Sequence, residues 1–168
     1  VLSKRPDLKL VEFRGNVETR IRKIENMVAY ASLLANAGIS RLGIEIALPH
    51  MLIPVTEFIP AVGQGIICIM ACKGKFDLSH INHAPSFAAA TAERAVLKAF
   101  GGNCYTPLAA HALVENGKIL LSGFVASDDG RRTYTTRTEG NLAAAADLGC
   151  ELGKELLYKY NDLNNKAG

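Results

Sequence analysis

The stretch AAHALVENGKILLSGFVASDDGRRTYTTRTEG, residues 109–140, decides the fold of the second half of the chain. It contains two hairpin signals, Asn116-Gly117 and Asp129-Gly130, and these separate three β-prone runs. Antiparallel strands can be joined by turns this short, whereas parallel strands need a long crossover. The stretch therefore predicts a three-stranded antiparallel sheet.

One helix is predicted before this sheet in the sequence and another after it. A long helix over about 85–100 begins at Pro85, which suits a first helical turn, and ends at the glycine pair 101–102. A last helix over about 142–160 carries leucines four residues apart on one face. These are Leu148, Leu152 and Leu156. We expect residues 84–168 to form a small α+β domain whose sheet is covered by helices.

The first part of the chain has a different order of elements. The apolar runs 8–13 and 31–35 are predicted to be strands, and each precedes a segment with helical spacing, over about 17–27 and 37–44. A β–α–β–α order favours a parallel sheet. We therefore expect an α/β domain over residues 1–58.

A segment rich in proline and glycine, residues 59–83, joins the two parts. It contains one apolar run, IICIMAC (66–72), which is predicted to be a further strand. Cys68 and Cys72 in this run are followed by His80 and His83, a set that could suggest a metal site.

Strand geometry argues against that metal site. Four residues of strand separate the two cysteine Cα atoms by about 13 Å, too far for one zinc ion with bonds of about 2.3 Å. We expect Cys68 and Cys72 to be apolar filler and Cys150, which lies off the leucine stripe of the last helix, to be unreactive. No metal is predicted.

The composition is that of a protein with a core. Of 168 residues, 49% are hydrophobic and 21% are charged, and no apolar run approaches the length of about 20 residues that a membrane span needs. No signal-peptide pattern is recognised, and four cysteines do not make a disulfide scaffold, so we expect a protein of the reducing cytoplasm.

Charge is unevenly placed along the chain. Residues 1–41 hold eight Lys and Arg against four Asp and Glu, whereas the remainder sums to −1. A basic surface favours an anionic partner. Nucleic acid is disfavoured, because the basic residues are not interleaved with aromatic ones and no binding motif is present.

The segment RGNVETRIRK (14–23) is the best candidate for binding that anion. Gly15 and Asn16 precede a helix, whose unpaired N–H groups and dipole favour negative charge. Arg14 and Arg20 add planar guanidinium groups that match a carboxylate or phosphate. The alternative is an ordinary surface helix with solvated arginines.

The loop GGNCYTP (101–107) carries the cysteine of greatest interest. Gly101 and Gly102 leave room, and Asn103 tolerates a left-handed turn, so the thiol of Cys104 could be a nucleophile or carry a covalent group. A Cys/His hydrolase using His111 stays open, although seven residues of extended chain separate the two side chains.

Several stretches, in collinear order, carry a resemblance to a known family. They are RPDL (5–8), RGNVETR (14–20), LLANAGISRLG (33–43), PAVGQG (60–65), TAERA (91–95) and GGNCYTP (101–107). Together they resemble the porphobilinogen deaminase (hydroxymethylbilane synthase) family.

The resemblance implies a transferase of tetrapyrrole and haem biosynthesis that joins four porphobilinogen molecules into hydroxymethylbilane and releases ammonia. It implies a dipyrromethane cofactor attached to Cys104 by a thioether, with Arg14 and Arg20 binding the acetate and propionate groups of cofactor and substrate. The substrate-binding residues that it implies are Arg14, Gly15, Arg20, Leu34, Ala35, Arg41, Gln64 and Gly65.

The same resemblance implies the domain organisation. Residues 1–58 would be part of a second, central domain with a parallel sheet like that of periplasmic binding proteins. Residues 59–83 would cross toward a first domain, and residues 84–168 would be the cofactor-anchoring domain. The family's catalytic aspartate lies in that first domain, so we expect no catalytic residue here and an inactive fragment of a cytoplasmic monomer.

Some positions depart from the family's pattern. Gly101-Gly102-Asn103 stands where Glu-Gly-Gly is usual, Tyr30 where aspartate is common, and Cys68 and Met70 in a stretch that usually reads Gly-Ile-Glu. Two other functions stay open: a non-catalytic anion-binding module of the two-domain binding-protein type, and the Cys104 hydrolase.

Overall fold

The computed structural model describes residues 1–103 and 105–165. The chain divides into two compact units. One comprises Val1–Pro6 together with the chain from Val55 onward, and the other is Asp7–Pro54. Each unit is described by itself.

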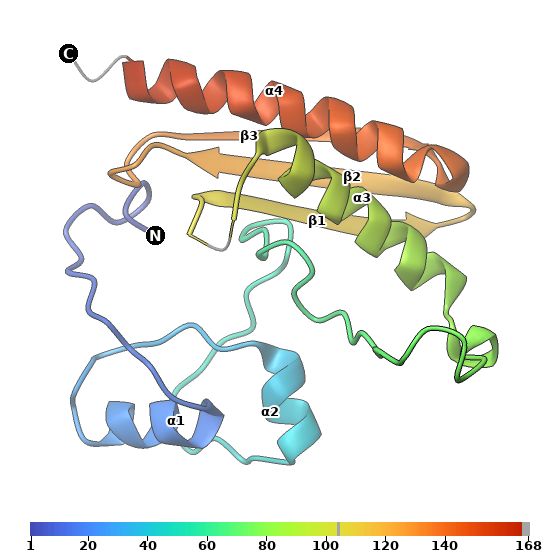
Figure 1. Ribbon diagram of the computed structural model, residues 1–168. Coiled ribbons are helices and arrows are strands. Elements are labelled where there is room, and N and C mark those ends of the chain that lie inside the picture. Colours follow the sequence, from blue (N-terminus) through green and yellow to red (C-terminus); the bar gives the residue numbers. More distant parts are fainter. Residues whose placement is uncertain (104, 166–168) are drawn as a thin grey trace. The chain divides into compact units, whose positions relative to one another are not determined.

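The larger unit contains the predicted antiparallel sheet. Strands β1 (Leu108–Glu115), β2 (Lys118–Ala126) and β3 (Thr133–Asn141) pair in the order β1-β2-β3 (Figure 1). Both residues of the first turn have positive φ, +50° at Asn116 and +75° at Gly117, as a tight hairpin with the twist of its strands requires. The prediction from residues 109–140 is confirmed.

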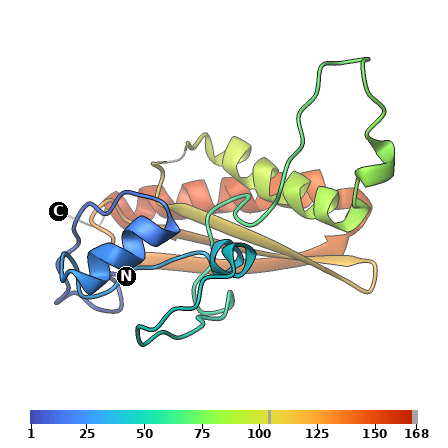
Figure 2. The same cartoon turned by 90° about the horizontal axis from the view of Figure 1, so that it is seen from below.

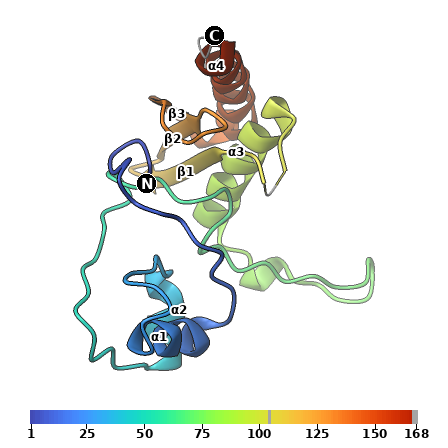
Figure 3. The ribbon, with the colours of Figure 1, turned by 90° about the vertical axis from the view of Figure 1, so that its left-hand side faces the viewer.

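Two long helices lie side by side on one face of this sheet (Figures 1 and 3). Helix α3 (Ala84–Phe100) has Pro85 in its first turn and ends at Gly101, whose φ of +75° provides the left-handed cap. Helix α4 (Ala145–Asn165) follows a short 3-10 turn, η2 (Leu142–Ala144). The predicted helix boundaries agree with these to within a few residues.

The two helices approach closely because α4 has glycine where it meets α3. A Cβ added at Gly149 would collide with the carbonyl oxygen of Ala92, and one at Gly153 would lie 2.5 Å from the carbonyl oxygen of Val96. Small residues let helix backbones come together at a distance that side chains would otherwise prevent.

The core lies between this helix pair and the sheet. Among the described residues, every buried hydrophobic side chain comes from the part of the chain between Ala89 and Leu156. The largest that are fully buried are Ile119, Leu121, Leu156, Val96 and Val125.

The smaller unit, Asp7–Pro54, has two short helices and no buried core. Helices α1 (Val17–Glu25) and α2 (Asn36–Leu42) contain no buried residue. They meet where Val17 lies beside Gly38, at whose position a Cβ would be 3.5 Å from the valine methyl group.

The predicted strands at 8–13, 31–35 and 66–72 are absent from the described structure, and the parallel sheet expected for residues 1–58 is not formed there. A strand is stabilised by hydrogen bonds to a neighbouring strand, and these runs have no ladder partner among the described residues. Their apolar content made them β-prone, but propensity alone does not form a sheet.

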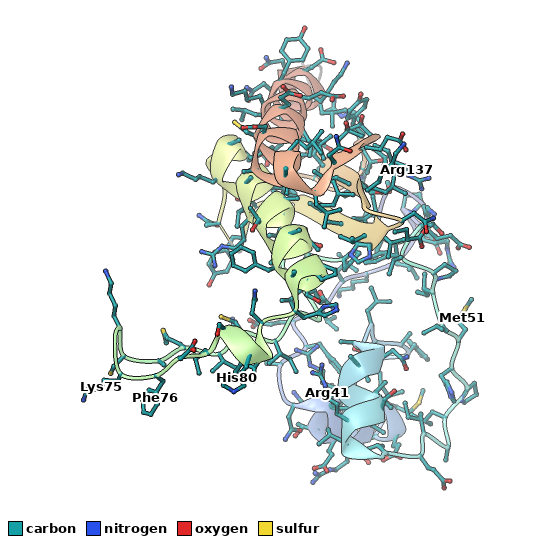
Figure 4. All side chains as sticks on the ribbon, turned by 90° about the vertical axis from the view of Figure 1, so that its right-hand side faces the viewer. Arg41, Met51, Lys75, Phe76, His80 and Arg137 are labelled. Carbon is teal, nitrogen blue, oxygen red and sulfur yellow. The ribbon has the colours of Figure 1, made fainter. Side chains whose placement is uncertain are left out.

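The chain before α3 extends away from the sheet and helices of its own unit (Figure 2). Lys75 and Phe76 lie at its tip, and His80 belongs to a single 3-10 turn, η1 (Ser79–Ile81) (Figure 4). In the described part of the chain, no helix combines the length and the apolar character needed to cross a membrane.

Candidate functional site

The start of α1 is a well-defined turn around Gly15 and Asn16. The side chain of Asn16 accepts a hydrogen bond from the backbone N–H of Thr19 (2.8 Å) and caps the helix. Gly15 has φ +132°, and a Cβ there would lie 2.8 Å from a methyl carbon of Thr19. Glycine is thus required by both the backbone conformation and the available space.

Basic side chains fold back over this turn. Arg20 Nε donates to the carbonyl oxygen of Gly15 (2.9 Å), and Lys23 Nζ donates to that of Arg14 (2.8 Å). One edge of the Arg20 guanidinium is therefore fixed on the backbone, which orients its other N–H groups. The structure brings the predicted residues Gly15 and Arg20 into direct contact.

Arg14 is held by a carboxylate. Its Nε donates to Glu12 Oε1 (2.6 Å), and its side chain is 86% exposed. An exposed pair of this kind contributes only about 0–1 kcal/mol. An incoming carboxylate with two oxygens in the right place could therefore replace Glu12.

Other predicted residues of this unit lie on or before α2. Leu34 is partly buried and Ala35, the N-cap residue, is exposed, with no side-chain hydrogen bond at the cap. Arg41 lies exposed in the last turn (Figure 4), and Gly43 ends the helix with φ +61°. The contact between Val17 and Gly38 joins this helix to the start of α1.

Gln64 and Gly65, the predicted residues of the crossing segment, belong to a compact turn in the larger unit. The backbone N–H of Gln64 donates to the carbonyl of Ala61 (3.0 Å), and that of Ile66 donates to Gly63 (3.3 Å). Gly63 and Gly65 have φ of +74° and +85°, so both glycines are needed for the turn. Gln64 itself is exposed.

Cys104 lies outside the described residues, but the residues on either side of it form a hydrogen-bonded loop. The Asn103 side chain accepts from the Tyr105 N–H (2.9 Å), and the Asn103 N–H donates to Thr106 Oγ1 (2.8 Å). Described non-glycine residues with positive φ are Met27 and Asn116, so Asn103 does not adopt the left-handed conformation that asparagine tolerates. Asn103 acts through its side chain instead.

A pocket of about 270 Å³ adjoins this loop. Its lining comprises residues of the loop together with Phe100, Asp128 and Tyr160. The Tyr160 hydroxyl donates to Asp128 Oδ1 (2.6 Å), and this hydrogen bond, with a smaller contribution from desolvation, raises the pKa of Tyr160 above its usual 10.0. A carboxylate in its wall makes this pocket unsuited to an anion.

The cysteines predicted to be filler are not buried. Cys68 and Cys72 are both exposed, because the run that holds them forms no strand and packs against no sheet. Within the described residues, no group of three or more His, Cys, Asp or Glu side chains could hold a metal ion. His111, the base considered for a hydrolase, lies beside Glu93, with Nδ1 3.5 Å from Oε1.

The sequence analysis missed Glu93. It is 2% exposed, yet it is an acidic residue on the core face of α3. The signal was available, because Ala89, Val96 and Phe100 lie on the same apolar face at helical spacing. A charged residue within such a stripe indicates a buried hydrogen-bonded group.

Comparison with protein families matches nearly the whole chain. Residues 1–80 match the family model described as "Porphobilinogen deaminase, dipyromethane cofactor binding domain", and residues 87–158 match "Porphobilinogen deaminase, C-terminal domain". Together the two matched regions include every stretch that carries the resemblance.

Curated proteins agree with this comparison. The chain is 44% identical to the porphobilinogen deaminase of Trichlorobacter lovleyi over 162 residues, which cover 94% of this chain and 51% of that protein. It is 42% identical to that of Syntrophomonas wolfei over 159 residues, covering 92% and 52%. The chain thus spans about half the length of the curated relatives it matches.

Proposed function

The chain belongs to the porphobilinogen deaminase family, and from this premise we propose that it is part of a transferase that condenses porphobilinogen into hydroxymethylbilane. Four porphobilinogen molecules would be joined head to tail, with release of ammonia. The observation that carries this proposal is the match of two models of this family, in order, over residues 1–80 and 87–158.

We propose Cys104 as the attachment point of a dipyrromethane cofactor through a thioether. When bound, such a group supplies a covalent primer that keeps the growing product on the protein. The hydrogen bonds of Asn103 to Tyr105 and Thr106 support this role, because they fix the backbone on both sides of residue 104.

Arg14 and Arg20 are proposed to bind the carboxylates of cofactor and substrate. Each pyrrole ring carries two carboxylates, and guanidinium groups pair with carboxylates through two parallel hydrogen bonds. Arg20 is supported by its oriented guanidinium, and Arg14 by an exposed partner, Glu12, that a substrate can displace. The remaining proposed substrate-binding residues are Gly15, Leu34, Ala35, Arg41, Gln64 and Gly65.

The finer fold is also a proposal. We propose that the runs 8–13, 31–35 and 66–72 become strands, the first two in a parallel sheet of a central domain, when further strands of the protein pair with them. Exposed apolar side chains support this, since Leu10 is 62% exposed and Met70 is 94% exposed. The boundaries 1–58, 59–83 and 84–168, the cytoplasmic location and the monomeric state remain predictions.

The experiment that tests the function is intact-mass analysis combined with turnover, using the protein at its full encoded length. We expect a mass excess equal to one dipyrromethane that disappears in Cys104→Ala. Arg14→Leu and Arg20→Leu should each reduce turnover of porphobilinogen by tenfold or more, by the loss of charge-assisted hydrogen bonds (about 1.5–3 kcal/mol each).

Arg22→Leu is the matched control for these arginine variants. Arg22 lies exposed on the same helix, and we propose no role for it, so its turnover should stay near that of the wild type. An unmodified Cys104 thiol, or normal turnover in both arginine variants, would contradict the proposal. Reaction of that thiol with an acyl-type probe would instead favour the hydrolase.

A further inference from the structure

Among the described residues of the core, Glu93 is a charged side chain that is almost completely buried. It lies on α3, is 2% exposed, and shares its helix face with the buried residues Ala89, Val96 and Phe100. A buried carboxylate is unfavourable unless its oxygens accept hydrogen bonds. Both oxygens of Glu93 do so.

The two oxygens serve two different segments. Oε1 accepts from the backbone N–H of Ala112 (2.9 Å), and Oε2 accepts from the backbone N–H of Gly63 (2.7 Å). Ala112 belongs to β1, which is an edge strand of the sheet, so the first contact satisfies an N–H that has no neighbouring strand. The second contact reaches 30 residues back along the chain.

That second contact fastens the turn of residues 61–65 to the helices. Val62, next to Gly63, packs against the core, so a hydrophobic contact and a charged hydrogen bond hold the same turn. Gly63 adopts φ +74°, a backbone conformation that favours glycine at this turn. Gln64 and Gly65 follow Gly63 directly in the chain, so these contacts also fix their position.

We propose that Glu93 is a positioning residue: it holds the turn of residues 61–65 against α3 and β1, so that Gln64 and Gly65 are presented to the substrate. The proposal rests on the substrate-binding role proposed above for Gln64 and Gly65. Glu93 acts through this turn and has no contact with the substrate itself.

Both acceptor oxygens of Glu93 are required. In Glu93→Gln, the amide keeps one acceptor oxygen and gains an NH₂ group, which is only a donor. Facing two N–H groups, it can accept from one and must place a donor against the other. A side chain of equal size therefore keeps the packing but releases either Gly63 or Ala112.

The test uses the protein at its full encoded length, with Glu93→Gln as the variant and Glu151→Gln as its matched control on the exposed surface of α4. Amide hydrogen exchange is followed at residues 61–65, and KM and kcat are measured with porphobilinogen. In Glu93→Gln, exchange in the turn should rise about tenfold or more. KM should rise several-fold, by a larger factor than kcat falls.

A second variant isolates the turn. Gly63→Ala leaves α3 and β1 intact, because the space around Gly63 is open, but it strains a residue at φ +74°. We expect the same rise in exchange and in KM. If Glu93→Gln does not fold, the same measurements on Gly63→Ala test the proposal in its place.

Unchanged exchange at 61–65 in folded Glu93→Gln would overturn the proposal, and so would faster exchange with an unaltered KM. A uniform increase in exchange over α3, α4 and the sheet, with none specific to the turn, would reduce Glu93 to a stabilising residue. If the wild type does not turn over porphobilinogen, the proposed function fails. The exchange measurement would still decide whether Glu93 holds the turn.

Discussion

Residues 7–54 and residues 84–165 differ in what holds them together. In the second region, a sheet of adjacent strands packs on two long helices and encloses the buried core. In the first, two short helices bury nothing, and apolar side chains stay exposed. The C-terminal region thus contains its own packing partners, whereas residues 7–54 leave large apolar side chains exposed.

The largest expected effect is on the core of the sheet. Leu121→Ala removes a fully buried side chain, so we expect the free energy of unfolding to fall by about 2–5 kcal/mol. Leu10→Ala, in the first region, removes a side chain that is 62% exposed and should change the stability of this chain by about 0.5 kcal/mol or less. Urea denaturation of both variants measures these two changes in the free energy of unfolding. Equal losses of free energy would contradict the difference between the two regions.

The second effect is on the packing of the helices. Gly149→Ala places a methyl group against the carbonyl of Ala92 and should destabilise the protein by about 1–3 kcal/mol, despite the better helix propensity of alanine. Gly43→Ala is the control, with open space around it and only backbone strain, of about 1 kcal/mol. The thermal unfolding midpoint of Gly149→Ala should be lower than that of the wild type. A midpoint above that of the wild type would contradict the close approach of α3 and α4.

A smaller and local effect is expected at α1. Asn16→Ala removes the side-chain cap and should destabilise this helix by about 1 kcal/mol, whereas Asn16→Asp keeps an acceptor and should retain it. Because α1 contributes nothing to the core, the loss should appear as faster hydrogen exchange over residues 17–25 and leave the main unfolding transition unchanged. A shift of that transition would show that α1 is part of the cooperative core.

The smallest expected effect is on the pH dependence of the stability that Tyr160 of α4 contributes. The hydrogen bond to Asp128 raises the pKa of Tyr160 above 10.0, so this contact stabilises the folded state fully below pH 10 and is lost as the pH rises through the raised pKa. Tyr160→Phe should therefore be less stable than the wild type at neutral pH, and the difference should shrink in alkaline solution. A difference that stays constant to high pH would contradict the role of the hydroxyl.

The same contrast explains which predictions succeeded. Both hairpin turns, Pro85 at the start of α3 and Gly101 at its end depend on neighbours in the sequence, and the structure confirms them. The strands at 8–13 and 31–35 depend on pairing with distant segments, which local patterns cannot reveal.

The predictions for the site divide in the same way, into local features that were found and a distant contact that was missed. The turn at Gly15 and the helix start at Asn16 were visible as a motif, and the structure shows why each residue is needed. Glu93 was missed, because its partners Gly63 and Ala112 lie 30 and 19 residues away and contribute only backbone N–H groups. The apolar stripe around Glu93 indicates that the residue is buried, but no side-chain pattern identifies these backbone partners.

Hydrogen exchange along the chain tests most directly the contrast between the C-terminal region, which holds its own core, and the runs 8–13 and 31–35, which we propose to pair with further strands. It is measured in this 168-residue chain and in the protein at its full encoded length. The account predicts slow exchange over residues 110–125 in both, and over residues 8–13 and 31–35 in the full-length protein alone. Slow exchange of those two runs in the 168-residue chain, or fast exchange of them in both proteins, would contradict it.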